Sequence, residues 1–196
     1  PMRPIARRLS TLLAHPRLPW LATGLALALC LPSLGAGISL DDYFHRLALQ
    51  GEGVSSLHGN ILMDLFNFLP ADPAGRQEIL ETGIIPWWSS PDMRGSFLRP
   101  VTAATHVLDQ WLWPETFPLQ HAHNLLWFAL GLLAVAWLYR EADPRAAPAM
   151  VGLATLLFAL EDAHVLPAVW IANRNALLAL AFGACGVIWH MRWRRL

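Results

Sequence analysis

The sequence predicts an all-α membrane protein with about four transmembrane helices and a large helical outer loop between the first and the second. Of its 196 residues, 55% are hydrophobic. Only 14% are charged, about half the share in a typical soluble domain. The apolar residues gather in runs, and a helix needs about 20 such residues to cross a bilayer. The formal net charge of zero provides no field that would attract nucleic acid, so we expect no nucleic-acid partner.

The chain opens with a basic segment, and the first apolar run follows directly. Residues 1–18 contain four arginines and no acidic residue, and residues 19–40 contain no charge. We expect 1–18 to be a cytoplasmic N-terminus and 19–40 to be a transmembrane helix. An arginine-rich start before an apolar run is also typical of a signal peptide. We prefer an uncleaved span because further hydrophobic segments follow.

A long polar segment, 41–118, comes next and contains ten acidic residues against four arginines. Apolar residues at helical spacing predict amphipathic helices over 56–69 and 96–113. Glycine and proline punctuate 81–95, so we expect a loop there. The tryptophans of the segment are typical of a membrane–water interface, and stacking on a sugar ring is the functional alternative.

Residues 119–196 hold three further apolar runs with short connections, and we expect each run to form a membrane helix. The runs cover 125–139, 146–160 and 175–189. The last two are short for a span. They therefore borrow flanking residues or lie tilted within a bundle, or one of them is re-entrant.

The arginines predict the orientation in the membrane. With a cytoplasmic N-terminus, nine of the fourteen arginines lie on the cytoplasmic side. This distribution agrees with the positive-inside rule. It predicts a protein integral to a bacterial inner membrane, in contact with membrane lipid, with segment 41–118 outside.

Two acidic pairs fall at the same predicted membrane depth. Asp41 and Asp42 follow the first span, and Glu161 and Asp162 follow the third. Carboxylate oxygens suit a hard divalent cation such as Mg²⁺ or Mn²⁺. One carboxylate of a pair can instead act as a general base. For either pair taken alone we favour a solvated helix end, and the presence of both pairs on the same side strengthens the functional interpretation.

Two later stretches of the chain contain further candidate functional residues. After the acidic pair come "FLRPVTAATHVLDQWLWPETFPLQHAHNLLWF" and then "AHVLPAVWIANRNALLA". In this order the motifs resemble the GT-C superfamily, multi-spanning glycosyltransferases that use lipid-phosphate-linked sugars. The likeness is to the protein O-mannosyltransferase-like and tetratricopeptide-linked branch and covers about residues 38–190. Members of the superfamily have more spans, so we expect this chain to correspond to an N-terminal portion.

The resemblance implies that a sugar moves from a polyprenyl-phosphate donor to an acceptor hydroxyl at the outer face. It implies that Asp42 or Asp41 is the catalytic base, with Asp42 as our first choice, although nothing in the sequence separates the two. Arg99 and Arg174 match arginines that hold the lipid phosphate, and a guanidinium binds phosphate oxygens bidentately. An interfacial arginine that contacts headgroups is the alternative for each.

Glu161 and Asp162 stand where some members carry a second acidic motif, and they are the candidate ligands of a divalent cation, Mg²⁺ or Mn²⁺. The tetratricopeptide-linked branch has His-Pro at this place, so the metal role depends on the branch. His123 is a further candidate for contact with the donor. On a helix, the rings of His121 and His123 point about 200° apart, so they cannot bind one ion together.

Two non-catalytic interpretations remain. A membrane subunit, or a truncated or degenerate relative without transferase activity, would carry the same acids facing water. A small transporter would place acids near the centres of its spans, whereas these acids map to span ends.

Overall fold

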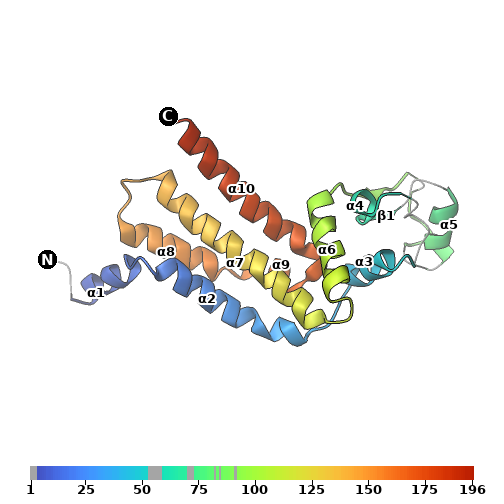
Figure 1. Ribbon diagram of the computed structural model, residues 1–196, viewed down its shortest axis with the longest axis horizontal. Helices are drawn as coiled ribbons and strands as arrows, with labels where there is room; N and C mark the ends of the chain where they lie inside the picture. Colours follow the sequence, from blue (N-terminus) through green and yellow to red (C-terminus); the bar gives the residue numbers. More distant parts are fainter. Residues whose placement is uncertain (1–3, 53–58, 70–72, 82, 84, 91) are drawn as a thin grey trace. The chain divides into compact units, whose positions relative to one another are not determined.

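The structure is a computed structural model that describes residues 4–52, 59–69, 73–81, 83, 85–90 and 92–196. It is mostly helical (Figure 1). The chain divides into two compact units. We call the first, Pro1–Gly37 with Phe117–Leu196, the bundle, and the second, Ile38–Thr116, the loop unit.

The bundle is built entirely from helical segments in its described part. In chain order these are α1 (Pro4–Leu13), α2 (Leu18–Cys30), η1 (Leu31–Gly35), α7 (Phe117–Ala142), α8 (Pro148–Ala159), η2 (Asp162–His164), α9 (Val165–Val169), η3 (Ile171–Asn173) and α10 (Arg174–Trp193). Helix α7 packs against α2, α8 and α10, and α1 packs against α8 (Figure 1).

Among the described residues, three segments are long and apolar enough to cross a membrane: Leu18–Gly35, Phe117–Ala142 and Ile171–Trp193. The third predicted run behaves differently. Helix α8 ends at Ala159, and the chain bends by 49° before it continues through Asp162–Val169. Counting this bent pair as one span gives up to four, so the short run at 146–160 forms part of a broken or re-entrant segment.

Small residues let the bundle helices approach closely, as is usual in membranes. Ala22 and Ala26 of α2 are buried in one core cluster with Phe128 and Leu132 of α7. A Cβ atom on Gly131 of α7 would lie 3.0 Å from the side chain of Leu180 on α10. The two longest helices therefore meet at a position that leaves little room for a larger residue.

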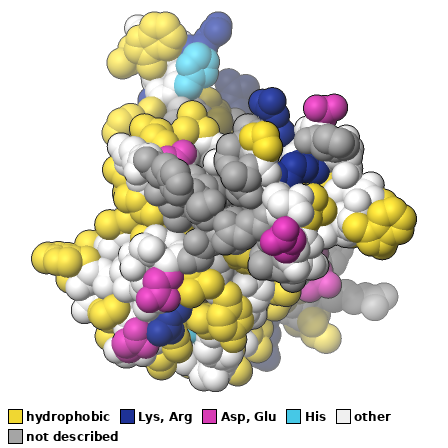
Figure 2. All heavy atoms as spheres, turned by 90° about the vertical axis from the view of Figure 1, so that its right-hand side faces the viewer, with side chains coloured by type: hydrophobic (Ala, Val, Ile, Leu, Met, Phe, Trp, Pro, Cys, Tyr) yellow, Lys and Arg dark blue, Asp and Glu magenta, His cyan; other side chains and the backbone are white. Residues whose placement is uncertain are grey.

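The loop unit is less regular than the sequence predicts. Its elements are α3 (Asp41–Leu49), α4 (Ile61–Asp64), β1 (Asn67–Leu69), α5 (Pro73–Glu81), β2 (Gly95–Ser96) and α6 (Pro100–Leu112). Strands β1 and β2 pair antiparallel, so the unit departs from the all-α prediction by one small sheet. On the face drawn in Figure 2, acidic, basic and hydrophobic side chains are interspersed.

The predicted amphipathic helix over 56–69 is wrong in its second half. Residues 56–58 lie outside the described residues, α4 covers only Ile61–Asp64, and the chain then becomes a strand. The backbone of this stretch bonds to the segment around β2, since Phe97 N–H donates to Phe66 O at 3.1 Å. Cross-strand pairing thus overrides the local helical spacing. The predicted helix over 96–113 exists but begins at Pro100, a residue suited to the first helical position.

Candidate functional site

The acidic pair lies at the start of α3, directly after a tight turn. Leu40 has a φ of +49° and a ψ of −121°, and Asp42 N–H donates to Ser39 O at 3.0 Å. These values place Leu40 at the second position of a type II′ turn, where glycine is favoured because L-residues are strained there. The two acids occupy the first turn of the helix, where the positive end of the helix dipole favours carboxylates.

The two carboxylates have different surroundings. Asp42 is only 5% exposed, and its Oδ2 accepts a hydrogen bond from Ser39 N–H at 2.9 Å. This bond closes the turn that leads into α3. Asp41 is half-buried and remains open to solvent on one side. Burial raises the pKa of the Asp41 carboxyl, and the positive charge of Arg99 opposes part of that rise.

Arg99 comes to Asp41 from the start of α6. Its guanidinium lies over the rings of Phe66 and Phe97, 5.0 and 4.6 Å from their centroids. Such cation–π contacts fix the direction of the side chain. Burial lowers the pKa of Arg99, and Asp41 opposes that change. Asp41 and Arg99 therefore form a half-buried pair of opposite charges with one restrained partner.

Buried histidines lie on the same two helices. His45, one helical turn after Asp41, has its ring centroid 5.1 Å from that of His106 on α6 and 4.5 Å from that of Phe66. Asp109, one turn after His106, is also buried. These groups join α3 to α6 beneath the Asp41–Arg99 end of the helices. The sequence shows that His106 and Asp109 are three residues apart, which is helical spacing. It does not show the contact between His45 and His106, because that contact depends on α3 being a helix that packs on α6.

Arg174 occupies a different setting, inside the bundle. Its side chain is fully buried. Its Nε donates to Asn124 Oδ1 at 3.2 Å and its Nη2 to Gln120 O at 3.3 Å. Asn124 in turn donates through Nδ2 to Pro167 O at 2.9 Å and Ala168 O at 2.8 Å. This network ties α7 to α9 and to the start of α10.

Asn124 is the residue of this network that the sequence does not reveal as important. Its partners lie 43, 44 and 50 positions further along the chain. Its signal in the sequence is an amide placed directly before the apolar run at 125–139, since buried amides need partners.

The other predicted residues of the bundle are spread over its surface and core. His121 is buried and donates from Nε2 to Gly37 O at 2.6 Å, whereas His123 Nε2 accepts a hydrogen bond from Trp127 Nε1–H at 3.0 Å. Both belong to the continuous helix α7, so their rings diverge. Glu161 and Asp162 are exposed at the bend after α8.

The predicted meeting of the acidic pairs stays a prediction, because Asp41 and Asp42 belong to the loop unit and Glu161 and Asp162 to the bundle. Within the described part of the chain, no group of three or more His, Cys, Asp or Glu side chains is arranged to hold a metal ion. No family model, curated protein or solved structure matches this chain. The resemblance to the GT-C superfamily therefore rests on the order of the motifs.

Proposed function

We propose that this chain belongs to a membrane glycosyltransferase of the GT-C type, in which Asp41 is the general base. The reaction moves a sugar from a polyprenyl-phosphate donor to an acceptor hydroxyl. The supporting observation is the setting of Asp41, a half-buried carboxyl with a raised pKa beside a restrained arginine. A base with a pKa closer to the working pH is a better proton acceptor in the transition state.

Asp41 fits the role of base better than Asp42, which was our first choice from the sequence. A base needs an open approach for the acceptor, and Asp41 is half-buried whereas Asp42 is 5% exposed. The hydrogen bond from Ser39 N–H gives Asp42 a structural part, since it closes the turn before α3. In this proposal Asp42 positions the helix and Asp41 takes the proton.

Arg99 is the proposed ligand of the donor phosphate. Its guanidinium stays charged at physiological pH, and the rings of Phe66 and Phe97 hold it in place before any ligand arrives. As the acceptor oxygen bonds to the anomeric carbon, its proton passes to Asp41. The bond from that carbon to the phosphate oxygen breaks, and the leaving phosphate keeps the electron pair. Arg99 stabilises the negative charge that develops there.

Arg174 has no contact with the donor in this proposal, because its guanidinium is engaged inside the bundle. His123 lies part-exposed on α7 and remains a candidate for donor contact. Glu161 and Asp162 supply two adjacent carboxylates, and among the described residues they lack the further ligand that would complete a Mg²⁺ or Mn²⁺ site. We therefore derive no step through a metal.

The proposal includes an orientation. The basic N-terminus, the α7–α8 turn and the C-terminus are cytoplasmic, and the loop unit lies outside an inner membrane. In this orientation the chain crosses the membrane four times. The loop unit follows the first crossing, and the bent α8–α9 pair is the third. The distribution of arginines supports this orientation through the positive-inside rule.

The test compares two neighbouring isosteric changes, Asp41→Asn and Asp42→Asn, in the full chain reconstituted into proteoliposomes. The measurement is transfer of radiolabelled sugar from polyprenyl-phosphate mannose or glucose. Loss of a general base reduces the rate by about a hundredfold or more. We expect that loss in Asp41→Asn and a smaller one in Asp42→Asn.

Full transfer by Asp41→Asn would show that the base is another group. If the unmodified chain transfers sugar from neither polyprenyl-phosphate mannose nor polyprenyl-phosphate glucose, the proposed activity is contradicted. The non-catalytic membrane subunit is then favoured.

A further inference from the structure

The N-terminal helix α1 has one apolar and one basic face, and none of its residues is buried. Ile5, Leu9 and Leu12 follow one another at helical spacing and are 79%, 56% and 67% exposed. Arg7 lies on the side of the helix opposite this stripe, Arg8 lies at its edge, and both are exposed. A helix of this kind lies in the headgroup layer of a membrane, with its apolar face toward the acyl chains.

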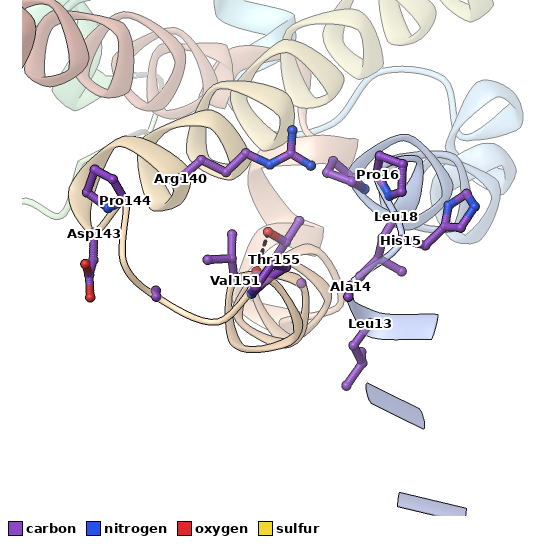
Figure 3. A pocket seen from close by; sticks show the side chains of 14 residues that line it. Leu13, Ala14, His15, Pro16, Leu18, Arg140, Asp143, Pro144, Val151 and Thr155 are labelled. Carbon is purple, nitrogen blue, oxygen red and sulfur yellow. Dashed lines mark hydrogen bonds between the residues drawn. The ribbon is translucent and has the colours of Figure 1, made fainter. Parts of the chain in front are cut away.

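A cavity of about 320 Å³ lies where α1 joins the bundle, between the α1–α2 turn and the α7–α8 turn. Leu13, Pro16 and Leu18 line one side, and Val151 and Thr155 line the other. Figure 3 shows the guanidinium of Arg140 extending over the cavity toward Pro16, whereas the carboxylate of Asp143 points away from it. The lining therefore combines apolar walls with one cation directed across the opening.

Close backbone packing builds one wall of this cavity. A Cβ atom on Gly152 of α8 would collide with the carbonyl oxygen of Leu13, at the end of α1. Gly152 is buried at this contact. The glycine thus lets α1 rest directly on α8.

Two residues of opposite charge line the cavity, Arg140 and Asp143, and only the guanidinium of Arg140 is directed over it. Glu141, next to Arg140, is engaged by Arg192 and Arg195, so it does not neutralise Arg140. Arg17 directly precedes α2 at the same end of the bundle. Near a membrane surface, each such cation contributes about 1 kcal/mol to the attraction of anionic lipid.

We propose that this cavity binds the phosphate headgroup of an anionic membrane phospholipid, with α1 lying in the same leaflet. The apolar stripe of α1 favours a lipid over free phosphate, because α1 ends at Leu13, which lines the cavity, and the exposed side chains of Leu9 and Leu12 can meet acyl chains. The cavity lies at the start of α2, whereas Gly37, which leads to the loop unit, follows the end of that helix. All residues that line the cavity belong to the bundle and Asp41 and Arg99 belong to the loop unit, so the proposal is independent of the proposed transferase activity.

The experiment uses the full chain in neutral detergent micelles. Binding of phosphatidylglycerol, phosphatidylcholine and inorganic phosphate is measured by native mass spectrometry and by the shift in thermal midpoint. We expect phosphatidylglycerol to bind more tightly than phosphatidylcholine, and inorganic phosphate to produce no shift at equal concentration. Arg140→Gln removes one cation, so we expect it to weaken the binding of phosphatidylglycerol about fivefold.

Arg145→Gln is the matched control, because Arg145 is exposed in the same turn but does not line the cavity. We expect it to change the affinity less than about twofold, and Arg140→Lys, which keeps the charge, to bind nearly as the unmodified chain does. Circular dichroism of each variant checks that the helices are retained.

If Arg140→Gln and Arg145→Gln lose affinity for phosphatidylglycerol equally, the lipid binds to a diffuse basic surface, and the proposed site is overturned. Unchanged affinity in Arg140→Gln would overturn it as well. Equal binding of phosphatidylcholine would contradict the selectivity for an anionic lipid, and an equal shift with inorganic phosphate would contradict the preference for a lipid.

Discussion

Arg99 in the loop unit and Arg174 in the bundle carry the same functional group in opposite settings. Arg174 is fully buried, and its guanidinium donates to Asn124 and to the carbonyl of Gln120. Arg99 is half-buried, lies over two aromatic rings and faces Asp41. The sequence assigns both to a lipid phosphate. The structure shows that Arg174 connects helices of the bundle, whereas Arg99 lies half-buried against two aromatic rings.

The difference follows from what each arginine finds nearby. In a membrane bundle, an internal charge is tolerated only when polar groups of the protein surround it. Asn124 and the carbonyl of Gln120 serve Arg174 in this way and also connect three helices. Arg99, by contrast, lies over two aromatic rings and beside the carboxylate of Asp41. Solvent exposure therefore distinguishes the two arginines, which the motifs treat alike.

The largest expected effect comes from removing the two charges with the same substitution. Arg174→Met leaves Asn124 Oδ1 and Gln120 O without this donor, and a buried acceptor left unsatisfied costs about 1–3 kcal/mol. Arg99→Met removes the cation–π contacts and the attraction of Asp41, together about 1 kcal/mol. Unfolding by sodium dodecyl sulfate in mixed micelles measures both free energies. Equal destabilisation by the two variants would remove the distinction between the arginines.

A second prediction concerns the dependence of stability on pH. Burial holds the folded-state pKa of Asp41 above its ordinary value of 3.8. The folded protein therefore holds the Asp41 proton more tightly than the unfolded chain does. Relative to Asp41→Asn, the unmodified protein loses stability as the pH rises from the pKa of Asp41 in the unfolded chain to its pKa in the folded protein. Asp41→Asn should be the more stable protein at neutral pH and should show no advantage at pH values below 3.8.

Asp42→Asn provides the contrast, since it weakens the hydrogen bond from Ser39 N–H and should reduce stability at neutral pH. Thermal midpoints measured across the pH range test both variants. A lower midpoint for Asp41→Asn at neutral pH would mean that its carboxylate stabilises the fold.

The smallest effect concerns the turn before α3. Leu40 is strained by its positive φ and is 70% exposed, so Leu40→Gly should relieve strain with little loss of packing. After the entropic cost of glycine, we expect a gain of about 0.5 kcal/mol. Leu47→Gly, within α3, is the control and should cost about 1 kcal/mol. A loss of stability in Leu40→Gly would show that the leucine side chain holds the turn.

Long apolar runs allowed the membrane helices to be predicted, because a continuous run such as 125–139 leaves few alternatives to a span. The bend after Ala159 was left open, since run length alone does not distinguish a tilted helix from a broken one. Strand β1 was missed because its partner around β2 lies about 30 residues further along the chain. Pairing with β2 therefore determines that residues 67–69 form a strand.

The candidate site was predictable as a residue list but not as an arrangement. Asp41, Asp42 and Arg99 emerged from motif order, yet only burial and the bond from Ser39 distinguish the two aspartates. The resemblance assigns Arg174 to the donor, and the sequence does not show its contact with Asn124, which lies 50 residues away along the chain. Sequence spacing reports neighbours within a helix, and these relations join different helices.

The pH dependence of sugar transfer tests the role of Asp41 most directly. A base must be ionised to act, so the rate should fall as the pH drops through the pKa of Asp41. The charge of Arg99 lowers that pKa. In Arg99→Gln, the residual rate, scaled to its own maximum, should therefore fall at a higher pH than in the unmodified chain. An acid limb at the same pH in both proteins, or one that persists in Asp41→Asn, would contradict the assignment of Asp41 as the base.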